Sequence, residues 1–261
     1  RDTDGDQLGT SGFDENDVAH YGYGKWLARN SGAFVMVDAL MATIDGSRAL
    51  NEDNTANWTS PTGVRAFRMW LELMQSGIRS ERDLTADLST SDSYFASGSE
   101  AMHHLASFRI GGLRANATFD PSVIEATSYP GVDGNPASVE TNAWYIGMSS
   151  QSQHKELAWR LLEMMVSKEG DLQWVQDTPG ILPARRSTIE SDWFQSEEAA
   201  FTRAIAEAAL ENSHLALTPP VAYGEFLVLA YHQVMQGESV EAALQRAADD
   251  YNTRLAEQTE Q

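Results

Sequence analysis

Apolar residues recur along much of this chain at the spacing that places them on one face of an α-helix. In one stretch they stand at Phe34, Val37, Leu40, Met41 and Ile44. This mixture of three- and four-residue steps predicts an amphipathic helix over residues 34–44. The dipeptide Asp45-Gly46 follows directly and is expected to end that helix.

A second helix is predicted to begin after Ser60. Serine is a favoured N-cap, and Pro61 suits the first helical position because no amide hydrogen is needed there. The apolar stripe of this helix consists of Val64, Phe67, Trp70, Leu71 and Met74. Gly77 follows, and glycine favours the left-handed conformation that commonly closes a helix.

Four further helices are predicted, at residues 153–166, 197–210, 223–236 and 239–255. Strands are few. Residues 94–105 predict the end of a helix, a turn and a short strand, and residues 142–148 predict a mostly buried strand. Glycine, proline and aspartate are dense at 128–136, which indicates a segment crossing between structural units.

Composition and charge narrow the classes of partner. The chain has 261 residues, 42% of them hydrophobic, which suits one large or two modest domains with a real core. The formal net charge of -20 disfavours nucleic acid and anionic membrane surfaces, since both would be repelled. Only three lysines are present, a pattern equally compatible with a saline habitat, a GC-rich genome or solubility alone.

The absence of cysteine removes several kinds of chemistry. With no thiol in the chain, disulfides, thiol catalysis and cysteine–zinc sites are excluded. This composition is compatible with an oxidising exterior without requiring one. The chain opens at Arg1 with neither an initiator Met nor a basic-then-apolar leader, and we interpret this as a processed, engineered or truncated start.

Metal ligation is weakly indicated. The acidic stretch 2–6 resembles a calcium loop, but Gln7 stands where the loop glycine is expected and Phe13 where the bidentate glutamate is expected. A solvated turn is therefore the favoured interpretation. His103 and His104 are adjacent on a predicted strand, and because strand neighbours point to opposite faces, they are not expected to share a metal.

Catalytic motifs are not found in the sequence. There is no nucleophile elbow, Walker loop, dinucleotide-binding fingerprint or His-Glu-x-x-His motif. With 38 acidic residues, neighbouring carboxylates occur by chance, so a glycosidase pair cannot be inferred. The sequence predicts neither an enzyme nor a cofactor.

Four segments, in order, carry a resemblance to a known family: residues 59–77; residues 94–102, with an aromatic-x-x-Gly-x-x-Ala-Met pattern; residues 142–187, which hold Gly-x-Leu-Pro-Ala-Arg at 180–185; and residues 237–244. Together they resemble the extracellular solute-binding proteins of ABC sugar importers, of the maltodextrin or oligosaccharide-binding type.

The resemblance implies an α/β, helix-rich, periplasmic-binding-protein-like fold with two lobes (type II), incomplete at the N-terminus. On that plan, residues 1–132 and 188–261 belong to the second lobe. Residues 137–187 are the returning segment of the first lobe.

The same resemblance implies a ligand site between the lobes. Its expected members are Phe108, Asn142, Trp144, Arg185, Tyr223, Trp26 and Asn30, with Gly180 facing the cleft. Packing roles compete for the aromatic members, because Phe108, Trp144 and Tyr223 suit a core as well as a ligand. We expect Phe34 and Phe226 to be core residues, and Trp58, Trp70, Trp159 and Trp174 to have packing roles.

The implied function is a receptor subunit that captures a sugar or oligosaccharide and delivers it to the permease of an ABC transporter. Such a receptor is expected to be monomeric, to lie outside the cell or in the periplasm, and to be membrane-tethered in its full-length form. Three alternatives stay open: a receptor for polyols or glycerophosphodiesters, a glycoside-acting enzyme, and a helical scaffold that has lost binding.

Overall fold

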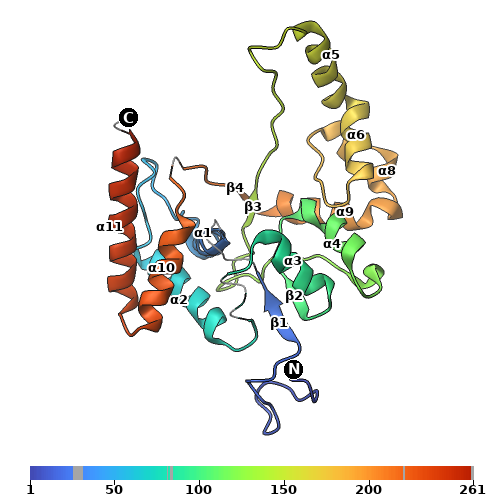
Figure 1. The fold of residues 1–261 in the computed structure, drawn as a ribbon. Helices are drawn as coiled ribbons and strands as arrows, with labels where there is room; N and C mark the ends of the chain where they lie inside the picture. Colours follow the sequence, from blue (N-terminus) through green and yellow to red (C-terminus); the bar gives the residue numbers. More distant parts are fainter. Residues whose placement is uncertain (26–31, 81, 83–84, 220, 260–261) are drawn as a thin grey trace.

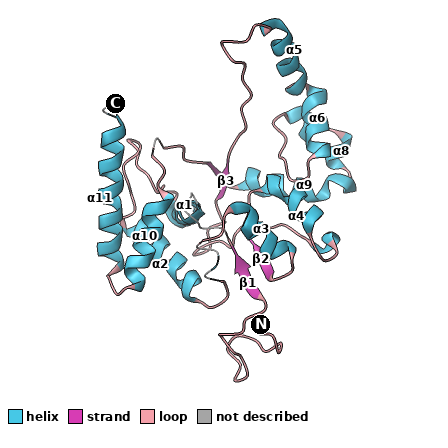
Figure 2. Ribbon diagram, in the orientation of Figure 1, coloured by secondary structure: helices cyan, strands magenta, loops and turns pink. Residues whose placement is uncertain are grey.

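The computed structural model describes residues 1–25, 32–80, 82, 85–219 and 221–259. Helices dominate it, as the sequence predicts (Figure 2). The described strands form two separate parallel pairs, β1 (Tyr21–Gly24) with β2 (Glu100–His103) and β3 (Val139–Thr141) with β4 (Ser213–Leu215). Each pair joins segments that are far apart in the sequence.

The largest core lies among four helices at one side of the molecule (Figure 1). These are α1 (Gly32–Asp45), α2 (Pro61–Gln75), α10 (Gly224–Met235) and α11 (Val240–Thr259). They pack as α1 on α2, α10 on α11, α1 on α10 and α2 on α11. We call this the four-helix region; its largest fully buried side chains include Trp58, Trp70, Phe67 and Tyr251.

Local sequence accounts for the start and the packing of α2. The Ser60 hydroxyl accepts a hydrogen bond from the Gly63 amide at 3.1 Å, which confirms the predicted N-cap. Trp70 contacts Phe67 edge to face, with ring centroids 5.2 Å apart. The predicted apolar stripe therefore faces the core.

A second, smaller core lies beside the β1–β2 pair. It contains Ile110, Leu113 and Ile124, with Phe95, Phe119 and Phe201 against them. The elements around it are α3 (Leu88–Ala96), η2 (Ser107–Arg109), α4 (Ile110–Asn116) and η3 (Pro121–Val123). This core joins parts of residues 1–132 to α9, and the division into lobes by residue range stays a prediction.

The adjacent histidines at the end of β2, His103 in the strand and His104 directly after it, have different surroundings, as predicted. The His103 ring lies 3.3 Å from an Asp92 oxygen and 3.0 Å from a Glu100 oxygen. The His104 ring instead contacts Tyr129 and Lys25. The two imidazoles therefore have separate sets of partners.

The remaining helices extend away from the four-helix region (Figure 1). They are α5 (Lys155–Met165), α6 (Lys168–Asp177), α7 (Arg186–Ile189), α8 (Asp192–Gln195) and α9 (Ala200–Glu211), with η4 (Glu197–Ala199) before α9. Consecutive members pack on one another. Helix α5 confirms the helix predicted at 153–166.

Two expectations for this part of the chain are wrong. Residues 142–148 do not form a buried strand: the described strand ends at Thr141, and the following chain has no strand partner and is exposed. Trp159 and Trp174 are about half exposed, whereas Trp58 and Trp70 are buried as expected. Apolar side chains are buried only when another surface covers them, and none among the described residues covers these.

The side chain of Asp2 holds the N-terminal loop together. The Asp2 carboxylate accepts hydrogen bonds from the amides of Asp6 at 2.8 Å and Asp14 at 2.9 Å. These bonds hold the pKa of Asp2 below its usual value, with the Asp14 amide as the main cause. The Asp2 carboxylate therefore binds backbone amides of its own loop, whereas in a calcium loop it would bind the ion.

No helix in the described part of the chain is long and apolar enough to span a bilayer.

Candidate functional site

Two of the predicted ligand-site aromatics lie together. Phe108, in η2, and Trp144, in the segment after β3, have ring centroids 5.8 Å apart and planes at 86°. Both rings are exposed, Phe108 by 40% and Trp144 by 79%. Two perpendicular rings that face solvent form an apolar corner, a shape that suits a ligand with a C–H face.

The backbone under Phe108 is supported by the Gly-x-Leu-Pro-Ala-Arg loop. Gly180 has φ +87°, a conformation that residues with a Cβ rarely adopt. A Cβ at this position would also collide with the carbonyl oxygen of Ser107, the residue before Phe108. Gly180 therefore lies behind the aromatic corner, where glycine permits close approach.

The residue after Phe108 fixes the other side of this turn. The Arg109 guanidinium pairs with the Asp92 carboxylate of α3 at 2.6 Å. This ion pair ties η2 to α3. The charge of Arg109 is thus engaged by a carboxylate beside the corner.

The segment that carries Trp144 is exposed along its length. Tyr145 is 90% exposed, and Ile146 and Met148 also face solvent. Asn142 lies in the same exposed segment, two residues before Trp144. This segment thus presents an amide and several apolar side chains outside any described core.

The other predicted site residues lie elsewhere. Tyr223 is only 7% exposed, packs edge to face on Tyr251, and donates a hydrogen bond to the Leu217 carbonyl at 3.2 Å. Burial raises its pKa. The structure thus gives Tyr223 the packing role weighed against ligand contact, and Phe226 is buried as predicted.

Arg185 is engaged between α5 and α7. Its Nε donates to the Val166 carbonyl, and its backbone amide donates to the Asp171 carboxylate at 3.3 Å. These bonds join the end of α5 to α6 and to the start of α7. Contact of Arg185 with a ligand stays a prediction. Trp26 and Asn30 lie outside the described residues.

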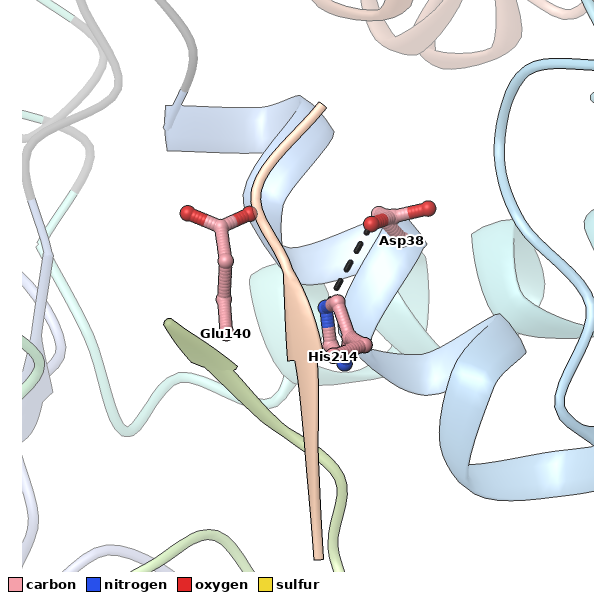
Figure 3. Close-up of side chains that lie close together, drawn as sticks. All are labelled: Asp38, Glu140 and His214. Atoms are coloured by element: carbon pink, nitrogen blue, oxygen red, sulfur yellow. Dashed lines mark ion pairs between the residues drawn. The ribbon is translucent and has the colours of Figure 1, made fainter. Parts of the chain in front are cut away.

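Sequence reasoning missed a second cluster, formed by Asp38 of α1, Glu140 of β3 and His214 of β4 (Figure 3). One ligand-type atom from each lies within 4.8 Å of the others. Glu140 and His214 are opposite each other in the β3–β4 register. No local motif signals this group, because its members come from three distant segments.

The electrostatics of the cluster centre on Asp38, which is fully buried. Desolvation disfavours its charge, but the nearby His214 ring, the Arg48 guanidinium and the Ala49 amide outweigh this and hold its pKa below the usual value. The pKa of Glu140 is raised, first by burial and then by the charge of Asp38. Two carboxylates thus compete for limited positive charge.

Comparisons with solved structures identify the fold. The maltose-bound MalE3 protein of T. maritima matches with a TM-score of 0.71 at 17% identity, over 90% of this chain and 60% of its own. A ribitol complex of a solute-binding protein from Agrobacterium radiobacter K84 gives 0.67 at 19%, over 89% and 59%. UgpB from Mycobacterium tuberculosis with glycerophosphocholine gives 0.65 at 17%, over 92% and 60%.

These likenesses confirm the predicted helix-rich, periplasmic-binding-protein-like fold. This chain spans only about 60% of the length of these structures. A search of curated proteins found no match. A family model for bacterial extracellular solute-binding proteins matches residues 11–202, which is most of the chain. The chain belongs to the family of bacterial extracellular solute-binding proteins.

Proposed function

We propose that this chain is the ligand-capturing part of an ABC-importer receptor, and that it binds a sugar or oligosaccharide at the Phe108–Trp144 corner. The carrying observation is the pair of exposed, perpendicular rings 5.8 Å apart. Exposed apolar groups cost free energy in water, so a pair of exposed aromatic rings supports a binding role. A sugar ring would cover them with its C–H face.

Polar groups around the corner favour an uncharged ligand. Arg109, next to Phe108, is paired with Asp92. A phosphate would require a cation that is free to pair with it. Asn142 offers an amide for hydroxyl groups. This favours a sugar over a glycerophosphodiester, the kind of ligand in the UgpB complex.

A second class of ligand also suits the aromatic corner. Faces of tryptophan and phenylalanine attract quaternary ammonium groups. Glycerophosphocholine carries such a group and is the ligand in the UgpB complex. It is therefore included as a test ligand, together with ribitol, the ligand in the Agrobacterium structure.

In the whole receptor, we propose that ligand capture closes a cleft between two lobes and that the closed form delivers its ligand to the permease. Hinge closure around a ligand is the common device of such binding proteins. A monomeric receptor, outside the cell or in the periplasm and tethered to the membrane in its full-length form, suits this role. Nucleic acid has no part in it, in line with the net charge of -20.

Calorimetric titration of the folded chain with uncharged mono- and oligosaccharides tests the proposal. We expect saturable binding and a raised melting temperature, since a ligand that binds only the folded state stabilises it. Phe108→Ala and Trp144→Ala should each weaken binding by about tenfold, which corresponds to about 1.4 kcal/mol. Trp159→Ala removes another exposed tryptophan, on α5, and should leave affinity unchanged.

Three outcomes would contradict the proposal. If both corner variants bound the sugar as tightly as the parent chain does, the ligand site would lie elsewhere. Saturable binding of glycerophosphocholine or ribitol alone would replace sugar by that class of ligand. Release of a new reducing sugar from a glycoside would make the chain an enzyme.

A further inference from the structure

The Asp38–Glu140–His214 cluster lies where three distant segments meet. Strand β3 contacts both α1 of the four-helix region and α9 of the opposite side. Strand β4 follows α9 and leads toward α10. Figure 3 shows Glu140 and His214 rising from these paired strands, with Asp38 on α1 beside them. The cluster thus joins the strands that connect the two sides of the molecule.

Asp38 is held in one orientation with acceptor capacity to spare. Its Oδ1 accepts from the Ala49 amide at 2.7 Å, and its Oδ2 accepts from Arg48 Nη2 at 2.7 Å. Arg48 Nε lies 3.2 Å from both oxygens. A carboxylate has about four lone-pair positions. The side of Oδ2 that faces His214 is therefore still able to accept a further ligand or donor.

His214 supplies a nitrogen that has no hydrogen-bond partner among the described residues. Its side chain is nine-tenths buried, and its Nε2 points at Asp38 Oδ2 at 3.4 Å. Its Nδ1 lies 2.7 Å from Ser138 Oγ. When Nδ1–H donates to that hydroxyl, the Nε2 lone pair faces the carboxylate. In that tautomer two electron-rich atoms face each other in a buried place, an arrangement that a cation between them would stabilise.

Glu140 completes the cluster as a second carboxylate. No hydrogen bond or ion pair of its carboxylate is found within the part of the chain that the structure describes. The positively charged or protonatable groups that act on it are His214, Lys25 and Arg48. With no bonded neighbour to hold it in the described structure, this carboxylate is available as a third ligand beside Asp38 and His214.

We propose that Asp38, Glu140 and His214 bind a divalent transition-metal ion of the zinc class. Two carboxylate oxygens and one imidazole nitrogen suit zinc, whereas calcium and magnesium prefer oxygen alone. Ligand atoms around zinc lie about 3.3 Å apart when bonds are about 2.0–2.1 Å long. The observed atoms lie within 4.8 Å, and the half-buried side chain of Glu140 closes the difference by rotation.

The groups behind the three ligands fit this assignment. Metal-bound histidines almost always donate their other N–H to an acceptor, and Ser138 is that acceptor here. Metal-bound carboxylates are themselves hydrogen-bonded, as Asp38 is by Arg48 and the Ala49 amide. The ion would then bridge α1, β3 and β4 and restrain the two connecting strands.

Titration of the chelator-treated chain with Zn²⁺ and Co²⁺ tests this site, which is independent of the aromatic corner. We expect one ion per chain, a raised melting temperature, and visible Co²⁺ absorption strong enough to report a four-coordinate site. Glu140→Gln keeps the shape of the side chain and should weaken binding at least tenfold; His214→Gln should weaken it about a hundredfold. His154→Gln removes an exposed histidine at the start of α5 and should bind like the parent chain.

Circular dichroism of the metal-free variants separates loss of binding from loss of fold. If His214→Gln fails to fold, Glu140→Gln still decides the question, because its carboxylate has no bond in the described structure to lose. Absence of one-to-one binding in the parent chain would overturn the proposal. The proposal would also be overturned if the folded variants bound the ion as tightly as the parent chain does. His214 and Asp38 would then form an ion pair only.

Discussion

The four-helix region and the strip formed by residues 142–177 contain similar large apolar side chains but bury them to opposite extents. Trp70 of α2 is 1% exposed, whereas Trp159 of α5 is 54% exposed. Both tryptophans lie on helices with apolar residues at helical spacing. Among the described residues, only α2 has neighbours that cover its apolar face. Helical pattern therefore predicts which residues seek burial, and a partner surface decides whether they reach it.

The strip also shows what an unpaired segment does. Residues 142–148 have the composition of a strand, yet without a neighbouring strand their backbone stays irregular and exposed. The solved relatives contain more chain than this protein matches.

Replacing one leucine in each region gives the largest expected difference. Leu227 of α10 is fully buried and Leu157 of α5 is 70% exposed. Leu227→Ala should lower the free energy of unfolding by about 2–5 kcal/mol, because it removes packed methyl groups and leaves a cavity. Leu157→Ala should change it by less than about 0.5 kcal/mol. Urea unfolding measures both, and equal losses would show that α5 is packed in solution.

Removing one partner of an ion pair in each region gives the next-largest expected difference in the free energy of unfolding. Asp38→Asn removes the buried partner of Arg48, and we expect a loss of about 2 kcal/mol at pH 7 because Arg48 is partly exposed. Glu156→Gln removes an exposed partner of Arg160 on α5 and should cost at most about 0.5 kcal/mol. Both are measured with a chelator present.

The effect of Asp38 should depend on pH in a definite direction. Its pKa is lowered by folding, so its stabilising effect is fully present above the unfolded value of about 3.9 and is lost as the pH falls through the folded value. The difference between the parent chain and Asp38→Asn should therefore shrink below about pH 4. A difference that stays constant through this range would contradict the assigned pKa shift.

Helix caps give the smallest difference. Ser60 caps α2 and Ser167 caps α6, each by accepting an amide hydrogen bond from a glycine three residues on. Ser60→Ala should lower the free energy of unfolding by about 1 kcal/mol. Ser167→Ala should mainly speed hydrogen exchange within α6, because that helix belongs to the projecting part of the molecule. If both variants lost the same free energy of global unfolding, α6 would unfold together with the four-helix region.

Much of the fold follows from local pattern. The N-cap at Ser60, the helices near both ends of the chain and the strand at β2 were predictable, because capping, period and glycine stops act over a few residues. The burial of Trp58 and Trp70 was predictable as well. The exposure of Trp159 was not, since no local signal tells whether a distant surface covers it.

The candidate sites divide in the same way. Phe108 and Trp144 could be named from the family resemblance, but their perpendicular contact depends on where η2 and the chain after β3 meet. Tyr223 illustrates the opposite outcome, since an aromatic at the start of a helix was equally suited to the core. The Asp38 cluster had no sequence signal at all.

The sequence by itself determined the longest helices, the cap at Ser60, the exclusion of thiol chemistry and the resemblance to solute-binding proteins, because each depends on residues close together or on composition. The tertiary structure alone decided which aromatic side chains reach solvent, where Gly180 supports Phe108, and that Asp38, Glu140 and His214 meet. Those features depend on contacts between distant segments, and such contacts exist only once the helices and strands have packed.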